Sequence, residues 1–174
     1  MLFISVRIPL EKIREGIGHA LRKSEEHLSN AELLISKNSL CDAVALIEFS
    51  IEEFGRAVAL REKLNAGSKD VERSLFSSHD YKYEKAWTVL PEELKTIYEG
   101  TFDTAVLGEA TLGEMALGET VSGVEKETIS PRTRLDATFV NYDEHEKEWK
   151  VGVPAEKEKL EIIIKGIREH IRSF

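Results

Sequence analysis

The sequence predicts an all-α protein, an up-and-down helical bundle in one domain covering residues 1–174. Apolar residues recur at steps of three and four over long stretches, which is the pattern of amphipathic helices. Proline, glycine and asparagine fall between these stretches and indicate short connections. With 174 residues, of which 41% are hydrophobic, the chain can build one sizeable core.

The first helix is predicted from about Pro9 to Lys37. Proline suits a first helical turn, and Asn38 suits the position just past the end. The ten residues MLFISVRIPL have too short an apolar core, and no small-residue cleavage site, for a signal peptide. A short strand, an ordered arm and an artefact of start-codon choice remain open for them.

The second helix is predicted from Ser39 to Gly67, with a capping box between Ser39 and Asp42. It is apolar on two sides, which is typical of the central, buried member of a bundle. A charged stripe runs between those sides at i, i+4 and i+8 (Glu48, Glu52, Arg56). Glu53 lies off the stripe among apolar helical neighbours, so we expect its carboxylate to be at least partly desolvated.

Five further elements follow. We expect a short segment capped by Ser68, then a helix from His79 to Leu90 that Pro91 interrupts, then one or two turns in PEELKTIYE. The stretches RLDATFVNYD and EWKVGV predict a small β-hairpin near 137–152. Residues 155–174 predict a final amphipathic helix.

Residues 101–131 differ from the rest of the chain. From 101 to 130 there are six acidic residues and one basic residue, and glycine recurs every fifth position from Gly108 to Gly123. Neither a helix nor a strand presents a five-residue period on one face. We therefore expect an acidic, glycine-rich insertion that forms a solvated loop, with a functional lid as the alternative.

Composition excludes several classes of protein. A net charge of −8 argues against broad nucleic-acid binding, although residues 56–85 carry seven basic and five acidic residues and allow a local basic site. One cysteine, Cys41, excludes an intramolecular disulfide and a cysteine-rich zinc site. No apolar run reaches the ~20 residues of a membrane span, so the cytoplasm is the expected location.

Metal and cofactor sites are not expected. A di-metal carboxylate bundle needs Glu-x-x-His pairs, and none of the five histidines has glutamate three residues before it. The sequence also contains no glycine-rich phosphate loop and no nucleophile elbow.

The chemistry that these residues support is metal-independent cleavage of RNA. On one helix His79 and Lys82 share a face at i, i+3, and Arg73 precedes them. Histidine titrates near neutrality, so it can take a proton from a ribose 2′-hydroxyl or give one to a leaving oxygen. Lysine and arginine can hold the phosphate, and the product is a 2′,3′-cyclic phosphate. An isolated His/Lys pair is more often a surface histidine beside unrelated charges.

Four motifs in order resemble the AbiV family of abortive-infection (phage-resistance) proteins. Residues 52–56 read EEFGR, where the family shows Glu-Glu-x-Gly-Lys, and residues 76–82 read FSSHDYK, an aromatic-x-x-His-x-x-Lys segment. Arg132 or Arg134 precedes FVNY at 139–142, and Trp149 and Pro154 follow. The resemblance covers about residues 25–90 and 130–170. Arg56 replaces the family lysine and Asn141 the family aspartate.

The resemblance implies a HEPN-type helical bundle that forms a homodimer and cleaves RNA without a metal or other cofactor. The Arg73–His79 spacing fits the superfamily pattern of arginine, four to six residues, then histidine. By this resemblance His79 would be the general acid or base, and Lys82 would act beside it on the phosphate. Glu53 and Glu52 would orient or charge-balance His79 and Arg56. Substrate contacts would come from Arg73, Arg132 and Arg134.

The expected function is therefore a ribonuclease or translation-arresting toxin in phage defence. The alternative is a non-catalytic HEPN-type regulator that acts through a phage or host protein partner. The surroundings of His79 discriminate the two. A histidine buried behind Phe76 and Tyr83 would be structural, whereas one that is open beside Lys82 and Glu53 would be catalytic.

Overall fold

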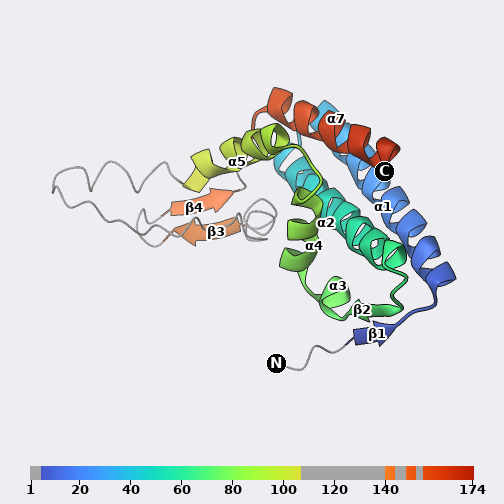
Figure 1. Ribbon diagram of the computed structural model, residues 1–174. Helices are drawn as coiled ribbons and strands as arrows, with labels where there is room; N and C mark the ends of the chain where they lie inside the picture. The colour runs from blue at the N-terminus through green and yellow to red at the C-terminus, as the bar shows by residue number, and fades with distance from the viewer. Residues whose placement is uncertain (1–4, 107–139, 144–147, 152–154) are drawn as a thin grey trace, which may run out of the picture.

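The computed structural model describes residues 5–106, 140–143, 148–151 and 155–174 (Figure 1). Over these residues the fold is a helical bundle with two small antiparallel sheets, so the predicted all-α class is confirmed. Its elements are β1 (Ser5–Arg7), α1 (Leu10–Ser36), α2 (Leu40–Asn65), β2 (Asp70–Glu72), α3 (Ser74–Ser77), α4 (His79–Trp87), α5 (Glu92–Val106), β3 (Val140–Asp143), β4 (Glu148–Val151) and α7 (Lys157–Ser173).

The two long helices α1 and α2 form a hairpin because α1 ends in a tight C-cap. Asn38 adopts a positive φ of 60°, a left-handed conformation that asparagine tolerates. The backbone N–H of Asn38 donates to the carbonyl of Ile35, and that of Ser39 donates to Leu34. Gly67, also at positive φ, ends α2 in the same way, so both predicted helix ends are close to the observed ones.

Helix α2 is the buried centre of the bundle, as its two apolar sides predict. In Figure 1 it lies between α1 on one side and α4 on the other. Its side chains join those of α1, α4, α5 and α7 in the largest apolar cluster. The ring of Phe174, after α7, packs edge-on to Phe54 at 5.3 Å between centroids. The predicted final helix is confirmed, with its apolar face buried in the core (Leu160, Ile163, Ile164, Ile167).

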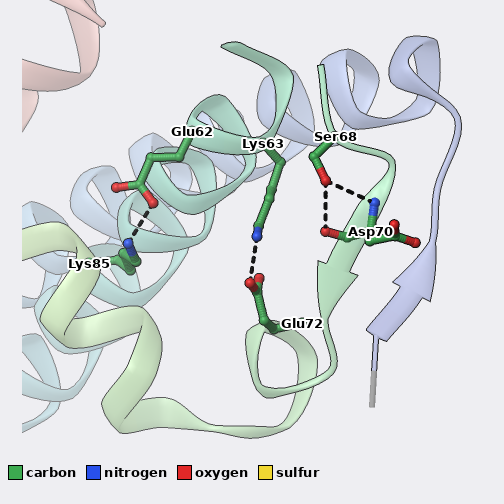
Figure 2. Close-up of polar contacts among 6 residues, drawn as sticks. All are labelled: Glu62, Lys63, Ser68, Asp70, Glu72 and Lys85. Atoms are coloured by element: carbon green, nitrogen blue, oxygen red, sulfur yellow. Dashed lines mark hydrogen bonds and ion pairs between the residues drawn. The ribbon is translucent and has the colours of Figure 1, made fainter. Parts of the chain in front are cut away.

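The C-terminal end of α2 is tied by side chains to the elements that follow it (Figure 2). The Nζ atom of Lys63 lies 2.5 Å from an oxygen of Glu72, and Lys85 Nζ lies 2.5 Å from an oxygen of Glu62 on α2. Ser68 precedes a strand and does not cap a helix. The strand that follows, β2, pairs antiparallel with β1, which confirms the strand alternative for residues 5–7.

Two further local predictions need correction, and a third falls mostly outside the described residues. Ser39 makes no side-chain hydrogen bond to a backbone N–H, because its hydroxyl donates to the carboxylate of Asp42 at 2.6 Å. Helix α5 is longer than the one or two turns expected, and its last residues, 101–106, were assigned to the acidic insertion. Residues 107–131 of that insertion lie outside the described residues.

The hairpin expected near 137–152 is present as β3 paired antiparallel with β4, in a register that places Tyr142 opposite Trp149. None of the described helices is long and apolar enough to cross a membrane.

Candidate functional site

The candidate site is built where the middle of α2 meets the start of α4. The Oε2 atom of Glu52 lies 2.7 Å from Nδ1 of His79 and 3.0 Å from Nζ of Lys82. One carboxylate oxygen therefore accepts from two side chains of another helix. The predicted shared face of His79 and Lys82 is confirmed, since both reach the same atom.

Two of these three side chains are buried and the third is exposed. The side chains of Glu52 and Lys82 are 6% and 5% exposed, whereas that of His79 is 48% exposed. A buried carboxylate and a buried ammonium are tolerable together because each neutralises the other. The imidazole of His79 is therefore exposed at the surface, while its Nδ1 is hydrogen-bonded to a carboxylate that belongs to a buried ion pair.

The first turn of α4 fixes the direction in which His79 points. Ser78 is the N-cap residue, and its Oγ accepts from the backbone N–H of Tyr81 at 3.2 Å. His79 is the first residue of the helix, directly after the extended Ser78. The N-terminal end of a helix carries partial positive charge, which favours the ionised Glu52 beside it.

Gly55 allows α4 to approach α2 closely enough for these contacts. A Cβ atom at position 55 would lie 1.7 Å from the backbone oxygen of Lys82 and 3.0 Å from the backbone nitrogen of Ala86. Such distances are far inside van der Waals contact, so only glycine fits. The glycine of EEFGR thus brings the backbone of Lys82 against α2, one turn beyond Glu52.

Electrostatics keep Glu52 ionised. Burial acts to raise the pKa of its carboxyl group, but hydrogen bonds from His79 and Lys82 and the charge of Lys82 outweigh it and hold the pKa below the usual glutamate value. A carboxylate that is ionised has only acceptor atoms, so the shared proton resides on Nδ1 of His79. The other ring nitrogen, Nε2, is then an acceptor whenever the imidazole is neutral.

Glu53 lies apart from this cluster. Its side chain is 17% exposed and its Oε2 lies 3.1 Å from a guanidinium nitrogen of Arg56, which is 31% exposed. The expected partial desolvation of Glu53 is present, but the carboxylate beside His79 is that of Glu52, which is more deeply buried. The neighbours of α2 explain the difference: α4 packs on the side of Gly55, and Glu52 is closer to that side than Glu53 is.

Three other predicted site residues are arginines. Arg73 is exposed at the start of α3 and makes no side-chain hydrogen bond or ion pair with another described residue. Arg132 and Arg134 lie outside the described residues. The structure therefore brings together Glu52, His79 and Lys82, and places Glu53 with Arg56 as a separate pair on the same helix.

A second buried carboxylate lies one turn earlier on α2. Glu48 Oε1 accepts from the phenolic hydroxyl of Tyr98 on α5 at 2.7 Å. Burial raises the pKa of the Tyr98 phenol well above its usual value, so this donor keeps its proton. Within the described part of the chain, no group of His, Cys, Asp and Glu side chains is arranged to hold a metal ion.

The AbiV family model matches residues 12–163, which is most of the chain. This protein belongs to the AbiV family. No curated protein and no solved structure matches the chain. Membership confirms the resemblance drawn from EEFGR and FSSHDYK, and it places the bundle in the HEPN superfamily with a link to abortive infection.

Sequence reasoning did not assign a role to Gly55, although a signal for one was present. A glycine inside a long helix costs about 1 kcal/mol relative to alanine, and such a residue often marks a close packing contact. What the sequence could not supply is which helix packs there.

Proposed function

We propose that this AbiV protein is a metal-independent ribonuclease, or a translation-arresting toxin of that type, that acts in phage defence. The observation that supports it best is the half-exposed His79, whose Nδ1 is held by the buried Glu52. A carboxylate–imidazole pair of this kind fixes both the orientation and the tautomer of the ring.

Proton transfer is assigned to Nε2 of His79. With Nδ1 donating to Glu52, Nε2 is the nitrogen left for the substrate, and it makes no hydrogen bond to any other described residue. A neutral ring could take the 2′-hydroxyl proton of RNA, and a protonated one could give a proton to the leaving 5′-oxygen. Glu52 acts as a positioning residue for the ring of His79.

Lys82 contributes to this site through Glu52. Because its ammonium is 5% exposed and lies 3.0 Å from that carboxylate, its first role is to keep Glu52 ionised and in place. We assign direct phosphate contacts to the exposed Arg73 and to Arg132 and Arg134. The protein is proposed to act as a homodimer in the cytoplasm.

The test is incubation of the purified protein with total RNA and transfer RNA in the presence of EDTA. We expect the wild type to cleave RNA and leave 2′,3′-cyclic phosphate ends, and His79→Ala to lose at least ~100-fold of the rate. His19→Ala, which removes an exposed histidine of α1, is the matched control and keeps full activity. An active His79→Ala protein would exclude this centre.

The second candidate function is a non-catalytic regulator that binds a phage or host protein. It is favoured by the burial of Lys82, which lets the three-residue cluster serve as a structural tie between α2 and α4. The net charge of −8 also suits protein partners better than RNA. Well-folded wild-type protein without any cleavage of RNA would support this function.

A further inference from the structure

A second histidine lies near Glu52, on the other long helix. His27 of α1 is half-buried, and its ring lies 5.6 Å, centroid to centroid, from the ring of Phe49 on α2. Phe49 is itself an exposed aromatic residue, three positions before Glu52. His27 therefore reaches the surface of α2 about one turn from the candidate site.

Helix geometry places the two histidines on opposite sides of Glu52. At 100° per residue, Phe49 lies about 60° to one side of Glu52 and Gly55 about 60° to the other. The Gly55 side is covered by α4, which carries His79, and Phe49 meets His27 of α1. Figure 1 shows α1 and α4 flanking α2 in this way.

We propose that His27 is a second catalytic residue of this protein, a proton-transfer group facing His79 across the surface of α2. The proposal rests on the proposed ribonuclease function and names a second catalytic group for it. Cleavage of RNA by transesterification moves two protons, one from the nucleophile and one to the leaving group, so it benefits from two such groups. The described residues supply both from one chain.

The two histidines have complementary environments. Glu52 holds the ring of His79 through Nδ1 at 2.7 Å, which leaves Nε2 for the leaving group. Burial and the charge of Lys23 lower the pKa of His27, while Glu26 and Glu52 act more weakly in the opposite direction. The lowered pKa suits a neutral His27 to accept a proton, and His79 is the group assigned to the other proton transfer.

The reaction balances with these roles. His27 takes the proton of the ribose 2′-hydroxyl, and the 2′-oxygen forms a bond to phosphorus. The bond from phosphorus to the 5′-oxygen breaks, and His79 gives its proton to that oxygen. A 2′,3′-cyclic phosphate and a 5′-hydroxyl result, and solvent returns each ring to its starting protonation state. The reaction needs no metal and no oxidant.

The experiment compares wild type, His27→Phe and His27→Ala in RNA cleavage over a range of pH. Phenylalanine keeps an aromatic ring against Phe49 but cannot carry a proton, so it separates a packing role from proton transfer. We expect both variants to lose about 100-fold in kcat with little change in KM. Both variants should also lose the fall in cleavage rate at acidic pH. In the wild type that fall comes from protonation of the general base, which is His27 in this proposal.

Two outcomes would overturn this inference, and they are distinguishable. If wild type cleaves RNA and His27→Phe matches it in kcat and pH profile, His27 is structural and this inference is wrong while the proposed function stands. If wild type does not cleave RNA at all, both fall. His19→Ala serves as the control for loss of a histidine from α1, and denaturant unfolding of each variant confirms that a loss of activity is not a loss of fold.

Discussion

At the scale of single residues, α2 is unusual for holding two buried carboxylates one turn apart. Glu48 and Glu52 are each met by donors from another helix, Tyr98 for one and His79 with Lys82 for the other. Buried charge is costly unless it is paired and hydrogen-bonded, so these partners are part of the reason that α4 and α5 pack where they do.

The hydroxyl of Tyr98 is predicted to stabilise the fold because it donates to a buried carboxylate. Tyr98→Phe should lower the free energy of unfolding by about 1.5–3 kcal/mol, measured by urea denaturation. Tyr83→Phe is the matched control, since the buried Tyr83 hydroxyl makes no hydrogen bond to a carboxylate among the described residues. If the two substitutions lower the free energy of unfolding equally, the hydrogen bond between Glu48 and Tyr98 does not stabilise the fold.

Glu52 makes the free energy of unfolding depend on pH in the acidic range. Its pKa is lower in the folded protein than the ordinary value of 4.5, so its contribution is fully present above that value and is lost as pH falls through the folded pKa. The difference in unfolding free energy between wild type and Glu52→Gln should therefore be largest near pH 7. It should shrink below about pH 4.5. A difference that stays constant from pH 7 to pH 3 would contradict the ion-pair account.

At the scale of elements, the position of α4 depends on one glycine. No side chain fits between position 55 and the backbone of Lys82, so α4 rests directly on α2. The contact carries His79 with it, because His79 and Lys82 belong to the same short helix.

Gly55→Ala is predicted to push α4 away from α2 and destabilise the protein by about 1–3 kcal/mol or more. The hydrogen bond between Glu52 and His79 should weaken as α4 moves away. Gly18→Ala is the matched control, because a Cβ at position 18 meets only the flexible end of Arg22, at 3.5 Å. In mid-helix that substitution should stabilise by about 0.5–1 kcal/mol. Similar stabilities for the two variants in denaturant unfolding would show that the close contact is not needed.

Helices were predictable where the helical apolar pattern continued over many residues and where proline, asparagine or glycine marked the helix ends. Helices α1, α2 and α7 meet both conditions, through Pro9, Asn38 and Gly67 among others. The sheet of β1 and β2 was not predictable as a pair, because its strands are three residues each and far apart in sequence. Helix α5 was underestimated because its C-terminal end reaches the edge of the glycine-rich segment.

At the scale of the whole molecule, an acidic chain holds a small site in its more basic part. The sequence indicated the motif and the face shared by His79 and Lys82. It did not indicate which of the adjacent carboxylates reaches them, because that depends on where α4 crosses α2. Glu53 had the more apolar helical neighbours, yet the carboxylate hydrogen-bonded to His79 belongs to Glu52.

The adjacent glutamates also offer the most direct test of the account. Glu52→Gln and Glu53→Gln are compared in cleavage of transfer RNA in EDTA, with equal amounts of folded protein. The account predicts that Glu52→Gln loses about 100-fold of the wild-type rate, because His79 loses its carboxylate partner, while Glu53→Gln stays within a few-fold. Unchanged cleavage by Glu52→Gln, or a larger loss in Glu53→Gln, would contradict a catalytic centre built on Glu52 and His79.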